Sequence, residues 1–127
     1  MLVLGPRVGV QQVDHGQRTV GNTLQDVDRI MVHPKTMIAS DGGVMAPGDN
    51  SPHPRNYGSF ARVLGVFVRE RELLPLTTAI HKMTMMPADR LSVGDRGRIE
   101  TGAFADIVVF DPDEIADTAT FEEPHQY

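Results

Sequence analysis

One short stretch constrains this chain more than any other: an apolar run at residues 36–40, closed by Asp41 and then by two glycines. A His-Pro pair precedes the run, so turn residues bound it on both sides. A short apolar run between such boundaries predicts a buried strand that delivers the Asp41 carboxylate into a loop. Gly42 and Gly43 would permit a sharp exit from that strand and leave space for a substrate beside Asp41.

This placement makes Asp41 the first candidate for a catalytic residue. In parallel α/β folds, catalytic groups lie at the C-terminal ends of strands, because the sheet fixes the side chain while the following loop adapts to the ligand. A carboxylate there serves as a general base or as a metal ligand. The alternative is an ordinary strand-end aspartate that caps the next turn.

A long loop, residues 42–57, follows the strand and carries a second candidate pair, His53 and Arg55. Long loops inside compact domains are usually functional. A guanidinium is well shaped to bind a carboxylate through two parallel hydrogen bonds, so Arg55 with His53 predicts an anion site beside Asp41. The alternative for Arg55 is a salt bridge that holds the loop in place.

Composition excludes several classes of function. The 127 residues are 40% hydrophobic and 23% charged, as in soluble globular proteins, and the net charge of −5 comes from interspersed acids and bases. Without a basic patch, nucleic acid is not expected as a partner. No apolar run is long enough to span a membrane, and no cysteine provides a disulfide or a thiolate metal site. We expect a soluble, cytoplasmic protein.

Apolar spacing predicts three helices. Thr23 and Asp26 form a capping-box pattern that opens the first, which ends at the His-Pro pair. The second begins at Ser59, and the third covers residues 77–83, with a further turn from Pro87 to Leu91. The expected apolar faces comprise Leu24, Val27, Ile30 and Met31 in the first helix, Phe60, Val63, Leu64, Phe67 and Val68 in the second, and Ile80 and Met83 in the third.

After Leu91 the pattern changes from helical to β. Turn residues surround a brief strand at 98–100, and the β-branched run at 105–111 is typical of a buried strand. Three segments are therefore expected: an N-terminal segment at 1–22, an α/β unit at 23–92 and a β segment at 93–127.

Other catalytic constellations are absent from the sequence. The five histidines are scattered, without a His-x-His pair or a helical pair four residues apart, so they do not compose a zinc site. They are His15, His33, His53, His81 and His125. Ser40 lacks the Gly-x-Ser-x-Gly context of a nucleophile elbow. His81 is expected to face solvent, and the methionines at 83, 85 and 86 are expected to fill gaps in the core.

An ordered series of motifs resembles the C-terminal part of the D-aminoacylases, the N-acyl-D-amino-acid deacylases of the metal-dependent amidohydrolase superfamily. The Ser-Asp-Gly to His-Pro-Arg arrangement is the part specific to that branch. The series covers most of residues 23–123 and lies at 37–42, 53–65, 69–70, 79–84, 87–88, 95–99 and 105–112.

The resemblance implies an α/β fold: the end of a (β/α)₈ barrel whose last strand carries Asp41, followed by strands of a small composite β-sandwich. In that family the corresponding aspartate takes a proton from a zinc-bound water and passes it to the departing amine. The arginine of the His-Pro-Arg motif, here Arg55, is expected to bind the carboxylate of the D-amino acid.

The same resemblance implies zinc as cofactor, with ligands on earlier barrel strands that begin with a His-x-His pair; none of those ligands lies in this chain. A minimal barrel needs about 250 residues, so the chain would hold the last quarter to half of one. The missing part is expected to precede it, and a fragment with open sheet edges is expected to be inactive alone and prone to self-association.

The leading hypothesis is a zinc-dependent deacylase that hydrolyses small N-acyl-D-amino acids to a carboxylic acid and a D-amino acid. Catalysis would use Asp41, and substrate binding would use Arg55, His53, Gly42 and Gly43. Two alternatives stay open. One is a cyclic-amide hydrolase acting on hydantoins or dihydropyrimidines, and the other is a non-catalytic remnant that pairs with another chain.

Overall fold

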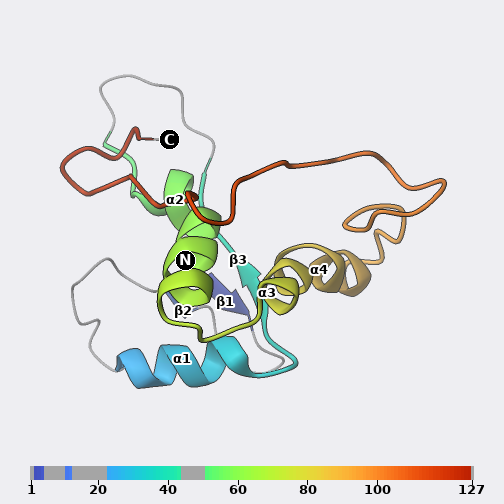
Figure 1. The fold of residues 1–127 in the computed structure, drawn as a ribbon, viewed down its shortest axis with the longest axis horizontal. Helices are drawn as coiled ribbons and strands as arrows, with labels where there is room; N and C mark the ends of the chain where they lie inside the picture. Colours follow the sequence, from blue (N-terminus) through green and yellow to red (C-terminus); the bar gives the residue numbers. More distant parts are fainter. Residues whose placement is uncertain (1, 5–10, 13–22, 44–50, 127) are drawn as a thin grey trace.

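A computed structural model describes residues 2–4, 11–12, 23–43 and 51–126, and Figure 1 shows their arrangement. The elements, in chain order, are β1 (Leu2–Leu4), β2 (Gln11–Gln12), α1 (Leu24–Val32), β3 (Met37–Ala39), α2 (Arg55–Arg62), the π-helix η1 (Val63–Glu70), α3 (Leu76–Met83) and α4 (Met85–Arg90). His15 and residues 44–50 of the long loop lie outside the described residues. No helix in the described part is long and apolar enough to cross a bilayer.

The strand predicted at residues 36–40 is confirmed as β3. The described strands form one sheet in the order β2-β1-β3, with β1 in the middle. Both pairs are antiparallel, and Val3 lies opposite Ile38. The expected parallel arrangement is therefore not seen in this sheet. The described part of the chain provides no parallel neighbour for β3, and β1 satisfies its backbone groups instead.

Helix α1 begins where the sequence predicts, because Thr23 and Asp26 form a reciprocal capping box. The Thr23 N–H donates to Asp26 Oδ2 at 2.9 Å, and the Asp26 N–H donates to Thr23 Oγ1 at 3.3 Å. Hydrogen bonds from the Thr23 backbone and side chain lower the pKa of Asp26. His33 caps the other end, as expected. Leu24, in the first turn, is exposed rather than on the buried face.

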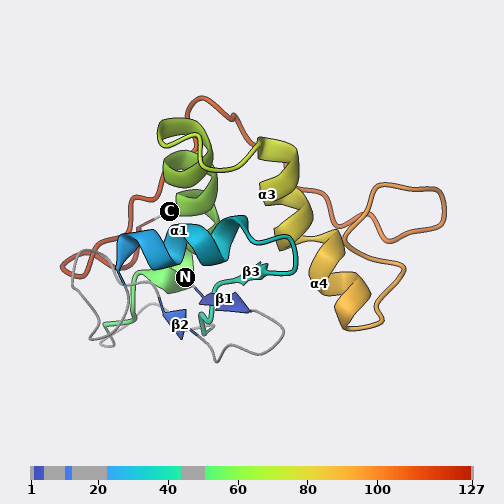
Figure 2. The same ribbon diagram turned by 90° about the horizontal axis from the view of Figure 1, so that it is seen from below.

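The hydrophobic core lies where α1, β3, η1 and α3 meet (Figure 2). Each of these elements contributes at least one buried apolar side chain. The buried members are Met31, Ile38, Val63, Leu64, Phe67, Leu74 and Ala79. Ile80 and Met83 pack against this cluster, as predicted for α3, and His81 is exposed.

The second helix differs from the prediction in both start and shape. It begins at Arg55, four residues before Ser59, because Pro54 already adopts helical angles and supplies the cap position. From Val63 it widens into η1, which ends with the Arg71 N–H donating to the Val66 carbonyl five residues back. The apolar face predicted for the second helix assumes 3.6 residues per turn. A π-helix has a wider turn, so this face is not continuous from α2 into η1. Phe60 is accordingly exposed.

Lys82 in α3 is buried, which the sequence pattern did not suggest. Its side chain is 3% exposed, and Nζ donates to the carbonyl oxygens of His33 at 2.5 Å and Thr36 at 2.9 Å. Burial lowers the pKa of Lys82. These two hydrogen bonds link α3 to the short connection between α1 and β3.

The strands predicted at 98–100 and 105–111 are not formed, and that prediction is wrong. Residues 91–126 contain no strand, so the structure shows no β-sandwich in this segment. Residues 105–109 are exposed instead, with Val108 at 83% and Val109 at 92%, while Phe110 packs against the hydrophobic core. A β-branched run becomes a buried strand only beside a partner that pairs its backbone, and no described strand lies there.

Candidate functional site

The backbone immediately after β3 holds Asp41 in an unusual conformation. Asp41 has φ of +51°, in the left-handed region that few residues other than glycine adopt, although aspartate tolerates it better than most. Its side chain is 43% exposed. The hydroxyl of Ser40, rather than the Asp41 carboxylate, accepts the Gly42 N–H at 3.1 Å. The Asp41 carboxylate instead faces the first turn of α2.

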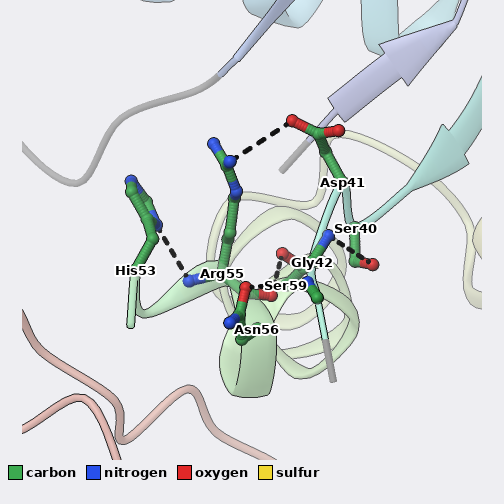
Figure 3. Close-up of polar contacts among 8 residues, drawn as sticks. Ser40, Asp41, Gly42, His53, Arg55, Asn56 and Ser59 are labelled. Carbon is green, nitrogen blue, oxygen red and sulfur yellow. Dashed lines mark hydrogen bonds and ion pairs between the residues drawn. The ribbon is translucent and has the colours of Figure 1, made fainter. Parts of the chain in front are cut away.

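Arg55 reaches back from that first turn toward Asp41 (Figure 3). Arg55 Nη2 lies 3.4 Å from Asp41 Oδ2, so the two predicted residues are brought together. The Arg55 side chain is only 20% exposed, and its Nε and Nη1 are shielded from solvent with no hydrogen-bond partner among the described residues. A buried donor without an acceptor is costly, and an anion is the ligand that would satisfy a guanidinium.

Asn56 fixes the exit of β3 against the start of α2. Its side-chain oxygen accepts the Gly43 N–H at 3.2 Å. A Cβ at Gly42 would lie 3.0 Å from Asn56 Cα, tighter than most Cβ contacts, so glycine favours this close approach. Among the described residues, a Cβ at Gly43 would meet nothing within 4 Å. Gly42 therefore packs against α2, whereas no described atom crowds Gly43; contact of either with a substrate stays a prediction.

His53 lies at the start of α2, beside Arg55 in Figure 3. Its Nδ1 accepts the Arg55 N–H at 3.1 Å, which satisfies one of the free donors of the first turn. Its ring packs edge-on against Phe121, with 5.0 Å between the centroids. His53 therefore orients the backbone from which the Arg55 side chain projects, while direct contact with an anion stays a prediction.

Three further residues support the site and were missed from the sequence. Asn56 holds the loop, Ser59 Oγ donates to the Arg55 carbonyl at 2.8 Å, and Phe121 contacts His53. Asn56 could have been found from its place directly after the His-Pro-Arg motif. Phe121 carries no local signal, because it lies 68 positions from His53 in a segment without periodicity.

Metal ligands are the remaining feature of the site. Within the described ranges, no three histidine, aspartate or glutamate side chains are grouped closely enough to hold a metal ion. The Asp41 carboxylate is paired with a guanidinium rather than with other ligands. These residues therefore do not form a zinc site by themselves.

A model of the amidohydrolase family matches residues 3–127. The chain belongs to the amidohydrolase family. This confirms the superfamily expected from the Ser-Asp-Gly and His-Pro-Arg motifs.

Curated relatives of this amidohydrolase chain include three enzymes from Alcaligenes xylosoxydans xylosoxydans. The D-aminoacylase and the N-acyl-D-glutamate deacylase are each 52% identical over 99 residues, which is 78% of this chain and 20% of each relative. The N-acyl-D-aspartate deacylase is 50% identical over 101 residues, 80% of this chain and 20% of that enzyme. The resemblance to the D-aminoacylases is confirmed, and the chain spans about one fifth of these relatives' length.

A solved deacylase structure is also similar to this chain in fold. The crystal structure of N-acyl-D-glutamate deacylase from Bordetella bronchiseptica matches with a TM-score of 0.71 and 50% identity, over 79% of this chain and 20% of that one. That enzyme was crystallised with zinc and a phosphonate inhibitor that mimics the tetrahedral intermediate of its reaction. This amidohydrolase chain therefore shares its fold with one segment of a zinc-containing deacylase.

Proposed function

We propose that this chain provides the proton-transfer and substrate-carboxylate residues of a zinc-dependent deacylase acting on N-acyl-D-amino acids. One observation carries the proposal: Arg55 has two buried, unsatisfied donors and lies 3.4 Å from the exposed carboxylate of Asp41. The relatives at 50–52% identity are deacylases of this kind, which supports the same substrate class.

The proposed role of Arg55 is to bind the free carboxylate of the substrate. Nη2 is directed to Asp41, so Nε and Nη1 stay open for a second anion. A linear N-acyl amino acid has such a carboxylate, whereas a hydantoin or dihydropyrimidine ring does not provide one. Arg55 therefore favours the linear substrate over the cyclic-amide alternative.

The proposed role of Asp41 is proton transfer. Its carboxylate would accept a proton from the water that attacks the amide carbon and deliver that proton to the amine nitrogen as the C–N bond breaks. The products are then a carboxylic acid and a D-amino acid. An amine leaves poorly without a proton, so the position of Asp41 beside the carboxylate-binding Arg55 suits this step.

Zinc is proposed as the cofactor of the complete enzyme, because the neighbouring solved structure contains it. The described residues do not hold it. We propose that its ligands lie elsewhere in the complete enzyme, with β3 as one strand of a (β/α)₈ barrel. The role of this chain would then be proton transfer and substrate positioning rather than metal binding.

The first experiment titrates the full 127-residue chain with N-acetyl-D-glutamate while NMR follows the Arg55 side-chain N–H. We expect a saturable shift, which Arg55→Ala abolishes and hydantoin does not produce. An equal response to hydantoin, or none to N-acetyl-D-glutamate, would contradict the binding role.

The second experiment tests turnover in a chimera of the Alcaligenes D-aminoacylase that carries residues 23–127 of this chain in place of its own matching segment. Arg55→Ala should mainly raise KM, because it removes binding common to substrate and transition state. Asp41→Asn should lower kcat by about 10²- to 10⁴-fold, as loss of a general acid-base does. Full activity of the Asp41→Asn chimera would exclude the proton-transfer role.

A further inference from the structure

Residues 112–125, near the C-terminal end of the described chain, follow the outside of α2 and η1 and are named here the C-terminal strap. Both ribbon views show it returning from the α4 side of the molecule and running beside the α2 and η1 helices (Figures 1 and 2). The amino-acid pattern does not predict this course, because the segment is acidic and lacks periodicity.

Polar contacts fix the strap along its whole length. Arg69 Nη1 donates to the carbonyl oxygens of Pro112 at 3.1 Å and Ile115 at 2.7 Å. Arg62 Nη1 lies 3.3 Å from Asp117 Oδ2, and the Asp117 side chain is only 3% exposed. Near the end, Tyr57 Oη and His125 Nδ1 are 2.8 Å apart. The strap is thus held at its start, middle and end.

Two glycines in the helices let the strap approach closely. A Cβ at Gly58 would lie 1.8 Å from Asp117 Oδ1, and a Cβ at Gly65 would lie 2.8 Å from the Ile115 carbonyl oxygen. Both distances are shorter than real Cβ contacts, so the helix surface is shaped to the strap, at Gly58 to the Asp117 side chain and at Gly65 to the Ile115 backbone. This fit distinguishes the strap from a tail that rests on the surface.

The strap contacts the candidate site through Phe121. Phe121 packs edge-on against His53 at 5.0 Å and 75°, the geometry preferred by aromatic pairs. His53 Nδ1 in turn accepts the Arg55 N–H. A continuous set of contacts therefore leads from Phe121 to the backbone of the residue whose guanidinium faces Asp41.

We propose that the C-terminal strap positions Arg55 for the substrate carboxylate, with Phe121 acting through His53. This inference rests on the proposed function, since it assigns Phe121 a role in the same carboxylate site. Phe121 is a positioning residue: it sets the orientation of the His53 ring and, through it, the first turn of α2. Loss of Phe121 removes one of the contacts that orient the His53 ring, and we expect this to weaken the hydrogen bond that the ring accepts from the Arg55 N–H.

The chain offers a matched control. Phe60, in α2, is the same residue type and has the same 43% exposure as Phe121. Phe121→Ala and Phe60→Ala therefore remove equal side chains of equal exposure. Only the first removes the contact with His53.

The first measurement is amide hydrogen exchange at the Arg55 N–H in the full 127-residue chain, which needs no ligand. We expect Phe121→Ala to accelerate exchange by about five- to tenfold and Phe60→Ala by less than about twofold, in line with the strength of an aromatic pair. Phe121→Tyr, which keeps the ring, should restore protection. Equal acceleration in both alanine variants would overturn the inference.

The second measurement is KM and kcat of the deacylase chimera with N-acetyl-D-glutamate. Phe121→Ala should raise KM about five- to tenfold and leave kcat within about twofold, because it disturbs binding and not proton transfer. If KM rises equally in Phe60→Ala, the strap has only a general structural role. If the parent chimera has no activity and its Arg55 binds no carboxylate, the proposed function fails; if both are present and Phe121→Ala matches Phe60→Ala, only the strap inference fails.

Discussion

Two apolar runs that look alike in the sequence end in opposite environments. The run in η1 buries Val63 completely and leaves Phe67 only 3% exposed, whereas the run at 107–110 leaves Val109 92% exposed. Both are rich in β-branched and aromatic residues. The difference lies in what surrounds them: η1 packs against the core formed with α1, β3 and α3, and no described strand lies beside 107–110.

The comparison shows that an apolar pattern predicts burial only when a second surface is available. A helix pairs its own backbone groups and needs only side-chain partners, so η1 is buried as soon as its face meets the core. A strand needs a neighbour for its backbone as well. The 107–110 run therefore depends on a partner in a way that η1 does not.

The largest expected effect tests the buried run. Phe67→Ala should lower the free energy of unfolding by about 3–5 kcal/mol, because it removes a buried aromatic ring and leaves a cavity. Urea unfolding of the two proteins, followed by circular dichroism, measures the difference.

Phe104→Ala is the counterpart in the exposed region. Both rings carry an arginine guanidinium over one face, Arg71 at 5.2 Å from the Phe67 centroid and Arg96 at 4.2 Å from the Phe104 centroid. Phe104 is exposed, so its loss should cost only about 0.5–1 kcal/mol, the contribution of an exposed cation–π contact. An equal decrease in the free energy of unfolding for Phe67→Ala and Phe104→Ala would contradict the difference in burial between the two regions.

An intermediate effect is expected at Lys82, the buried charge beside the core. Lys82→Met should cost about 1–3 kcal/mol at pH 7, because the carbonyl oxygens of His33 and Thr36 each lose a buried donor. A variant as stable as the parent chain would mean that these hydrogen bonds do not stabilise the fold.

The cost of Lys82→Met should also depend on pH. Burial lowers the Lys82 pKa below its usual 10.5, so between the folded and unfolded pKa values the unfolded chain binds more protons. The free energy of unfolding of the parent chain therefore increases as pH rises toward 10.5. The Lys82→Met variant has no lysine at this position and does not show this increase. Urea titrations at pH 7 and pH 10 should show a larger difference at pH 10; a difference that shrinks would contradict this assignment.

The smallest effect is expected in the exposed run. Val109→Ala should change stability by less than about 0.5 kcal/mol, as surface substitutions do. Val63→Ala, the same change at a fully buried position, should cost at least about 1.5 kcal/mol. Thermal unfolding of both variants provides the comparison. A large loss at Val109 would show that residues 107–109, which are exposed in the structure, are packed in solution.

The residues of the candidate site also differ in whether they could be predicted from the local sequence or only from the tertiary structure. Asp41 and Arg55 could be found from sequence, since one follows a bounded strand and the other lies in a loop motif, and the structure brings them to 3.4 Å. Their roles stay predictions. Phe121 could not be found, because its contact with His53 depends on a segment that returns to α2 from far along the chain.

By itself, the sequence determined the features that depend on neighbouring residues. The Thr23 and Asp26 capping box starts α1, the His-Pro pair ends it, and the bounded apolar run forms β3, because each is decided by hydrogen bonds and backbone angles within a few residues.

Only the tertiary structure decided the features that need distant partners. It buried Lys82 against two carbonyl oxygens, placed the strap along Gly58 and Gly65, and left residues 107–109 exposed. The physical reason is common to all three: burial and hydrogen-bond satisfaction depend on surfaces that come together only when the chain folds.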